Sequence, residues 1–66
     1  MADYKKYWDI NCAISILLVR YGLVCNEGFI DACVERVMSD AGDEWNDDDC
    51  KIAIRNELNE LIQKNF

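Results

Sequence analysis

The sequence contains one strongly apolar stretch, INCAISILLVRYGLVC at residues 10–25, and this stretch limits what the chain can fold into. Twelve of its sixteen residues are apolar, counting alanine, cysteine and tyrosine, and Arg20 is its only charged residue. A helix that spans a membrane needs about 20 apolar residues, so this stretch is too short, and Asn11 and Arg20 interrupt it. We therefore expect no contact with a membrane and place the stretch in the central helix of a small domain.

Residues 5–21 have the spacing of a helix with one wide apolar face. Apolar residues recur at i, i+4, i+7, i+8 and i+11, which are Ile10, Ile14, Leu17, Leu18 and Tyr21. Ala13 and Ile16 widen this face beyond the arc of about 100° that a monomer's surface helix buries. Gly22 fits the left-handed position that ends many helices.

Two further helices are predicted, over residues 27–40 and 48–64. Asn26 is a good N-cap for the first, Gly42 is suited to its C-terminal end, and Asn46 or Asp47 would cap the second. Leu23, Val24 and Cys25 would bridge the first two helices. The chain contains no proline and only three glycines. The predicted fold is therefore all-α, a single domain of three helices over residues 1–66.

A chain of this length buries only a small core. For 66 residues, the free energy gained by burying apolar surface is close to the conformational entropy lost on folding. A second copy would cover the wide apolar arc, so we expect a packed or intertwined helical homodimer. The predicted dimer interface and core residues are Ile14, Leu17, Leu18, Tyr21, Ile30 and Val34.

The acidic segment at residues 40–49 is the second distinctive feature, with six acidic residues and no basic one. One interpretation is structural: acidic residues in the first turn stabilise a helix N-terminus, and Trp45 folds back onto the core. The alternative is a charged surface that mimics nucleic acid and binds a basic site on another protein. For this alternative the candidate partner-binding residues are Asp43, Glu44, Trp45, Asp47, Asp48 and Asp49.

Direct binding of nucleic acid is disfavoured because the net charge of −6 repels phosphate groups. A helix-turn-helix is possible by helix count, but the third helix would bring a run of aspartates to the phosphates. Calcium binding of the EF-hand type is also disfavoured, because Trp45 and Lys51 occupy positions where that loop needs oxygen ligands.

No catalytic, cofactor-binding or metal-binding residue is predicted. The four cysteines, Cys12, Cys25, Cys33 and Cys50, form no C-x-x-C motif, and the chain has no histidine to complete a zinc site or activate a nucleophile. No secretory signal is evident, so we expect the cysteines to stay reduced in the cytoplasm. The chain is accordingly predicted to be non-enzymatic.

The segments GLVCNEGFIDACVERVM at residues 22–38 and GDEWNDDDCKIAIRNELNELI at residues 42–62 resemble small early proteins of lambda-like bacteriophages. These are encoded by short reading frames between the exonuclease and excisionase genes. The resemblance implies a small, helical, homodimeric, non-enzymatic protein in the host cytoplasm. It also implies a regulatory role that favours lysis and disturbs the host cell cycle, through contact with a host or phage protein. It supplies no functional residues.

Overall fold

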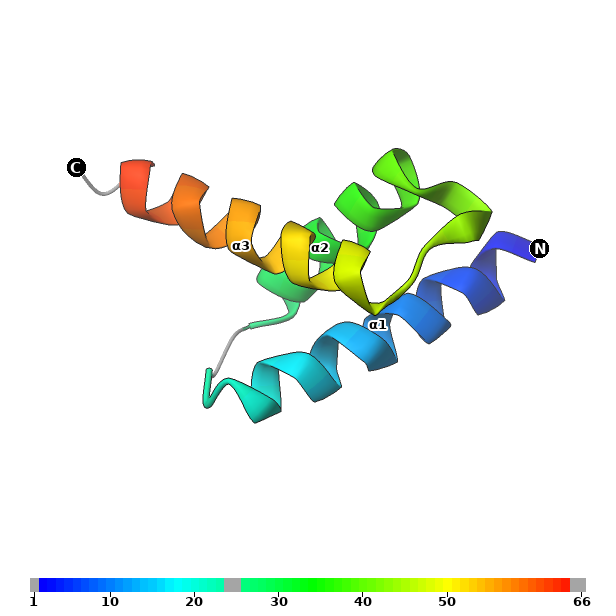
Figure 1. Cartoon of the computed structure of the whole chain (residues 1–66), viewed down its shortest axis with the longest axis horizontal. Coiled ribbons are helices and arrows are strands. Elements are labelled where there is room, and N and C mark those ends of the chain that lie inside the picture. Colours follow the sequence, from blue (N-terminus) through cyan, green and yellow to red (C-terminus); the bar gives the residue numbers. More distant parts are fainter. Residues whose placement is uncertain (1, 24–25, 65–66) are drawn as a thin grey trace.

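The computed structural model of the chain describes residues 2–23 and 26–64, and these residues form three α-helices and one short 3₁₀ turn (Figure 1). The elements are α1 (Ala2–Arg20), α2 (Glu27–Asp40), η1 (Gly42–Glu44) and α3 (Asp47–Lys64). The described residues contain no strand, so the all-α prediction with three helices is confirmed. Val24 and Cys25, which we predicted as part of a bridge, lie outside the described residues.

The local sequence determines where α1 begins and ends. Gly22 adopts a φ of 73°, and the Leu23 N–H donates to the Leu18 carbonyl at 2.9 Å while the Gly22 N–H donates to the Val19 carbonyl at 3.0 Å. This pair of bonds satisfies carbonyl groups that would otherwise lack partners at the end of the helix. At its other end α1 begins at Ala2, three residues before the predicted start. No helix-breaking residue separates residues 2 and 5, so the helix extends.

The N-terminus of α2 is capped as predicted. The Asn26 side-chain oxygen accepts a hydrogen bond from the Phe29 N–H at 2.9 Å, and Glu27 lies in the first turn, where its charge complements the helix dipole. At the other end, Gly42 has a φ of 61° and leads into η1. Residues with a side chain rarely adopt this backbone conformation, which explains the glycine at the point where the chain reverses toward α3.

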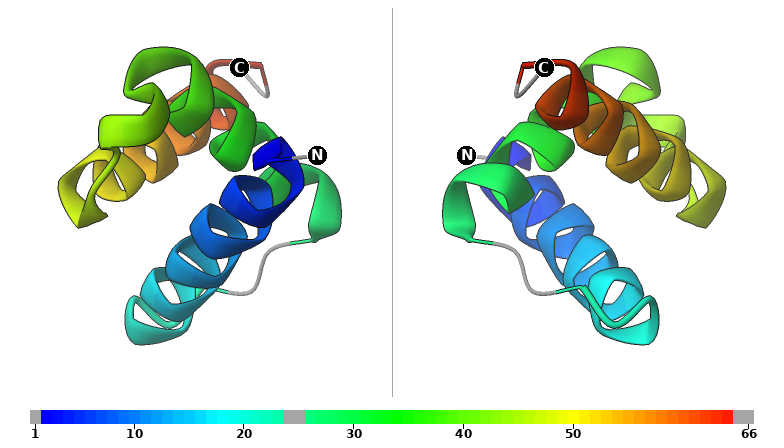
Figure 2. Two further views of the ribbon diagram at one scale, coloured as in Figure 1. Left: turned by 90° about the vertical axis from the view of Figure 1, so that its right-hand side faces the viewer. Right: turned by 90° about the vertical axis from the view of Figure 1, so that its left-hand side faces the viewer.

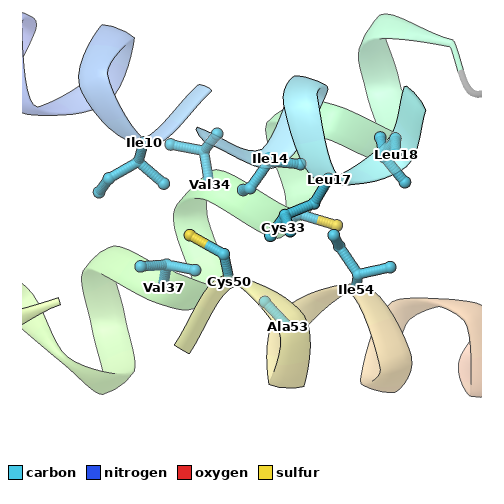
Figure 3. Close-up of a cluster of buried hydrophobic side chains, with 10 residues drawn as sticks. All are labelled: Ile10, Ile14, Leu17, Leu18, Cys33, Val34, Val37, Cys50, Ala53 and Ile54. Carbon is cyan, nitrogen blue, oxygen red and sulfur yellow. The ribbon is translucent and has the colours of Figure 1, made fainter. Parts of the chain in front are cut away.

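The core lies where the three helices meet, and every helix contributes to it (Figure 3). α2 and α3 both pack against the inner face of α1, and the two also pack against each other. The buried side chains are Ile10, Ile14, Leu17, Leu18, Cys33, Val34, Val37, Cys50, Ala53 and Ile54. The wide apolar arc of α1 therefore has two neighbours within its own chain, and part of the arc that we assigned to a second copy is covered by α2 and α3.

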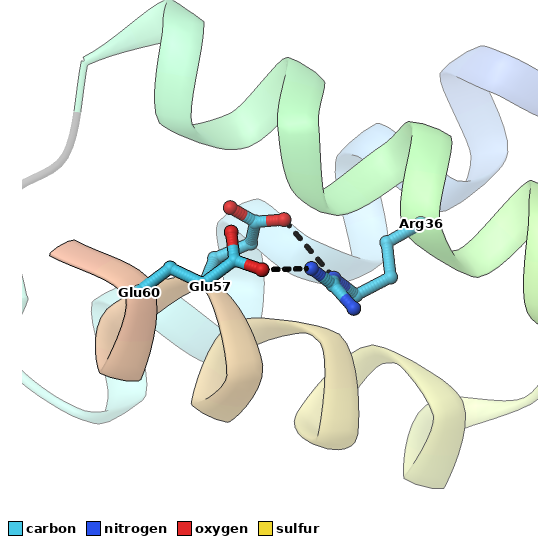
Figure 4. A network of polar contacts seen from close by, with 3 residues as sticks. All are labelled: Arg36, Glu57 and Glu60. Atoms are coloured by element: carbon cyan, nitrogen blue, oxygen red, sulfur yellow. Dashed lines mark hydrogen bonds and ion pairs between the residues drawn. The ribbon is translucent and has the colours of Figure 1, made fainter. Parts of the chain in front are cut away.

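Polar contacts at the rim of the core join the helices in pairs. Arg36 on α2 donates from Nε to Glu57 at 3.0 Å and from Nη2 to Glu60 at 2.8 Å, and both acids lie on α3 (Figure 4). The Tyr7 hydroxyl on α1 donates to Asp31 on α2 at 2.6 Å. Because such contacts are directional, they define how the helices sit against one another more than they stabilise the fold.

The core assignment predicts that Leu17→Asp unfolds or aggregates the chain, because it buries an unpaired charge at a position that is 6% exposed. Ile52→Asp is the matched control, since Ile52 is an exposed apolar residue of α3. Circular dichroism and size-exclusion chromatography distinguish the two variants. A fully helical, monomeric Leu17→Asp variant would rule out this core.

The buried thiol of Cys50 predicts a loss of stability at alkaline pH. Burial, with smaller contributions from Asp47 and Asp49, raises the pKa of this thiol to about 11. In the unfolded chain the thiol ionises near its ordinary pKa of about 8.5. Between these two values the unfolded state holds fewer protons than the folded state, so the free energy of unfolding falls as the pH rises.

Urea unfolding at pH 8, 9 and 10 measures this effect, with Cys50→Ala as the reference that cannot ionise. We expect the difference in unfolding free energy between the wild type and Cys50→Ala to shrink steadily as the pH rises. A difference that does not change with pH would contradict the assignment of Cys50 to a buried neutral thiol.

Candidate interaction surfaces

Most residues that we predicted for the dimer interface and core lie inside a single chain. Four of them are buried in the core: Ile14, Leu17, Leu18 and Val34. Ile30 is partly buried and packs against the same core, whereas Tyr21 is half exposed at the C-terminal end of α1. The four buried side chains have no surface left for a second copy in this arrangement, so the contact of two chains has to be sought elsewhere.

The outer face of α1 carries an apolar surface that the sequence analysis did not identify. We call it the outer stripe, and it consists of Tyr4, Trp8, Cys12, Ile16 and Val19, all exposed. Its four large side chains are 49–77% exposed. Successive residues of the stripe are four or three positions apart, which places them on one side of the helix. This spacing was the available signal, but Ile16 was assigned to the core face and Tyr4 and Trp8 to no face.

Aromatic rings enlarge the N-terminal part of this surface. The ring centroids of Tyr7 and Trp8 lie 5.4 Å apart in an edge-to-face arrangement, and those of Tyr4 and Trp8 lie 6.3 Å apart. Tyr7 and Trp8 both line two grooves. One, of about 610 Å³, runs toward the N-terminus of α2, and the other, of about 360 Å³, is lined by the three rings and Met38. Aromatic side chains placed in this way are typical anchors in protein interfaces.

A further groove lies between the end of α1 and the exposed side of α3. It has a volume of about 410 Å³, and its apolar lining includes Tyr21, which directly follows α1, and Leu58 and Ile62 of α3. Lys51 and Arg55 also line it, and no acidic residue does. In a chain of net charge −6 this is a local exception, so the groove favours a partner with apolar and acidic groups.

The acidic segment forms a helix cap. The Asn46 side-chain oxygen accepts hydrogen bonds from the Asp48 N–H at 2.9 Å and the Asp49 N–H at 3.2 Å. In return, the Asp49 carboxylate accepts from the Asn46 N–H at 2.9 Å. This reciprocal arrangement satisfies the first amides of α3, and the negative charges of its first turn complement the helix dipole.

The remaining residues of the acidic segment differ in their exposure. Asp43 accepts a hydrogen bond from Lys6 Nζ on α1, and this contact lowers the pKa of the Asp43 carboxyl. Trp45 is partly buried and packs against the core, as the structural interpretation requires. Glu44, Asp47 and Asp48 are exposed. The segment thus combines a structural role for Asn46, Asp49 and Trp45 with five exposed carboxylates, those of Asp40, Asp43, Glu44, Asp47 and Asp48.

Groups with chemical reactivity are few in the part of the chain that the structure describes. Residues 2–23 and 26–64 contain no cluster of three or more acidic, cysteine or histidine side chains that could hold a metal ion. The Tyr7 hydroxyl has a raised pKa, chiefly because it donates a hydrogen bond to the Asp31 carboxylate. Cys50 is buried, and its raised pKa keeps the thiol neutral, which makes it a poor nucleophile. Among the same residues, no helix is long and apolar enough to cross a membrane.

The cap geometry predicts that Asn46→Ala lowers the free energy of unfolding by about 1 kcal/mol, because the Asp48 amide loses its acceptor and the Asp49 amide keeps only the Asn46 backbone carbonyl. Asp48→Asn is the matched control, since the Asp48 side chain is exposed and its backbone amide remains bonded to Asn46. Urea unfolding followed by circular dichroism measures both variants. Equal stability of Asn46→Ala and the wild type would show that the cap contributes nothing.

The chain was compared with known proteins. No protein-family model, curated protein or solved structure matches it. The resemblance to small early proteins of lambda-like phages therefore stays a prediction, and inferences about function have to come from the surfaces described above.

Proposed function

We propose that this chain is a small, non-enzymatic regulatory protein of phage type that forms a helical homodimer. It acts in the cytoplasm by binding a host or phage protein and thereby modulates host or phage development. The observation that carries the proposal is the amount of apolar side chain left exposed. Eight large apolar residues of this 66-residue chain are 46–77% exposed. Contiguous exposed apolar surface usually marks a site of protein contact.

The total surface of the chain supports association. The accessible surface is 4886 Å², whereas a compact monomer of 7.7 kDa exposes about 4,300 Å². The excess fits the elongated shape, with principal extents of 39 × 21 × 20 Å. A monomer with more surface than its mass requires, much of it apolar, gains stability when that surface is covered.

The groove beside α3 is the surface that we assign to the partner protein. The second half of α3 extends beyond the core, where Leu61 and Ile62 are exposed (Figure 1). Lys51 and Arg55 add positive charge along the same groove. We expect a partner that inserts apolar side chains there and places carboxylates near these two basic residues.

The alternative proposal is an acidic nucleic-acid mimic that inhibits a DNA-binding protein. Four of its candidate carboxylates favour it, because Asp43, Glu44, Asp47 and Asp48 are all exposed and close in sequence. However, Trp45 is among the residues that the mimic would use to bind its partner, and Trp45 packs against the core. Asp49 is also engaged in the cap of α3. For these reasons we place the apolar groove first.

A pull-down from nuclease-treated bacterial lysate separates the two proposals. The tagged wild type is compared at low and high salt with Ile62→Glu and with the triple variant Asp47→Asn, Asp48→Asn, Asp49→Asn. Asparagine at position 49 retains an oxygen that can accept the cap hydrogen bond. Ile52→Glu is the matched control for Ile62→Glu, because both are exposed isoleucines of α3 and only Ile62 lines the groove.

We expect the wild type, the triple variant and Ile52→Glu to capture the same protein at high salt. Ile62→Glu should capture at least tenfold less of it. A protein retained only at low salt and lost with the triple variant would instead support the mimic, because contacts between exposed charges weaken with salt. If no captured protein responds to either set of substitutions, both proposals fail.

A further inference from the structure

We propose that the outer stripe of α1 is the surface on which a second copy of this chain docks. The two α1 helices would pack against each other about a two-fold axis that passes near Cys12. This inference rests on the proposed function, which includes a homodimer, and it adds which face joins the two copies. It replaces the interface predicted from sequence, whose central residues lie in the core of one chain.

The exposed area of the outer stripe is close to what a dimer needs. A large side chain exposes about 200 Å² when free, so the exposed fractions of Tyr4, Trp8, Ile16 and Val19 correspond to about 500 Å². Stable specific interfaces begin at about 600 Å² per partner. Lys5, Cys12 and Arg20 are also exposed on α1 and lie beside or within the stripe, so the surface reaches that size.

Charge favours α1 over the other helices as the contact between two copies. Two copies of a chain with net charge −6 repel each other over most of their surfaces. Helix α2 has four acidic residues and one basic residue, and α3 has five acidic and three basic. Helix α1 has two acidic and three basic residues and is the one helix of the described chain without net negative charge. It is therefore the helix along which two copies approach with the least repulsion.

The residue pattern of the stripe is compatible with two-fold symmetry. In a two-fold interface the same patch is used twice, and the residue at its centre faces its own copy. Cys12 lies at the middle of the stripe, with Trp8 and Ile16 four residues to either side. Antiparallel pairing places Trp8 of one copy against Ile16 of the other. The small side chain of Cys12 allows the helices to approach closely at the centre.

The stripe residues are exposed in the single chain, although Tyr4 and Trp8 also border grooves lined by residues of α2. Both α2 and α3 pack against the inner face of α1 (Figure 2). A dimer formed through the outer stripe would bury the exposed aromatic rings of α1 and leave the groove beside α3 available. The partner contact proposed above and the dimer contact are therefore on separate surfaces and can be tested separately.

Sedimentation velocity over a range of protein concentrations tests the interface. Ile16→Glu is compared with Ile52→Glu, because the two isoleucines are 55% and 54% exposed but only Ile16 lies in the stripe. We expect the wild type to form a dimer. Ile16→Glu should raise the dissociation constant of this dimer at least tenfold, and Ile52→Glu should change it by less than twofold. Circular dichroism confirms that each variant is folded.

Disulfide trapping provides a second measurement that does not depend on a destabilising variant. In a Cys25→Ser background, diamide oxidises two thiols to a disulfide and takes up the two electrons and two protons released. The buried Cys33 and Cys50 do not reach a second copy, so a covalent dimer has to form through Cys12. We expect a dimer on a non-reducing gel that is absent with Cys12→Ser.

The outcomes separate this inference from the proposed function. A wild type that stays monomeric at all concentrations overturns both the interface and the homodimer. A dimer that is unaffected by Ile16→Glu and gives no covalent product through Cys12 overturns only the outer stripe as its interface. A partner captured in the pull-down that Ile62→Glu abolishes would still support the regulatory role in either case.

Discussion

The burial of the inner face of α1 is the interaction on which the rest of the fold depends. Ile10 and Ile14 are completely buried, and the side chains that cover them come from both α2 and α3. Each helix packs against the other two, so removing any one would expose the apolar faces of both neighbours. In a chain this small one shared core serves every helix, and residues 2–23 and 26–64 contain no second core that could keep part of the structure folded.

The polar contacts around this core mainly orient the helices relative to one another. Arg36 joins α2 to α3 through two carboxylates, and Tyr7 joins α1 to α2 through Asp31. Exposed ion pairs contribute little to stability, because water screens them and the side chains lose conformational freedom. Their directional hydrogen bonds instead favour one arrangement of helices whose apolar faces could slide past one another. That arrangement decides which side chains of α1 are buried and which remain on the outer stripe.

The sequence was sufficient to predict the helices but not the division of α1 into two faces. Helical spacing, the caps at Asn26 and Asn46 and the left-handed Gly22 are local features, and the structure contains all of them. Whether Ile16 belongs to the core depends on where α2 and α3 cross α1, which is a property of distant residues. The prediction placed Ile16 in the apolar arc of the core, whereas Ile16 is exposed and belongs to the outer stripe. The 3₁₀ turn Gly42–Glu44 was missed because a single turn has no periodicity to detect.

The distribution of charge gives the two kinds of surface different roles. Carboxylates concentrate on α2, on η1 and at the start of α3, where those in the cap stabilise the helix and the exposed ones repel other acidic proteins. Apolar side chains are exposed on the outer stripe of α1 and beside α3, and the groove beside α3 is lined by no acidic residue. Repulsion over one part of the surface limits unspecific association. The apolar surfaces elsewhere allow two molecules to associate only in certain orientations. A small chain with one core can thus keep two apolar surfaces exposed without general aggregation, which is what a protein that acts through specific contacts requires.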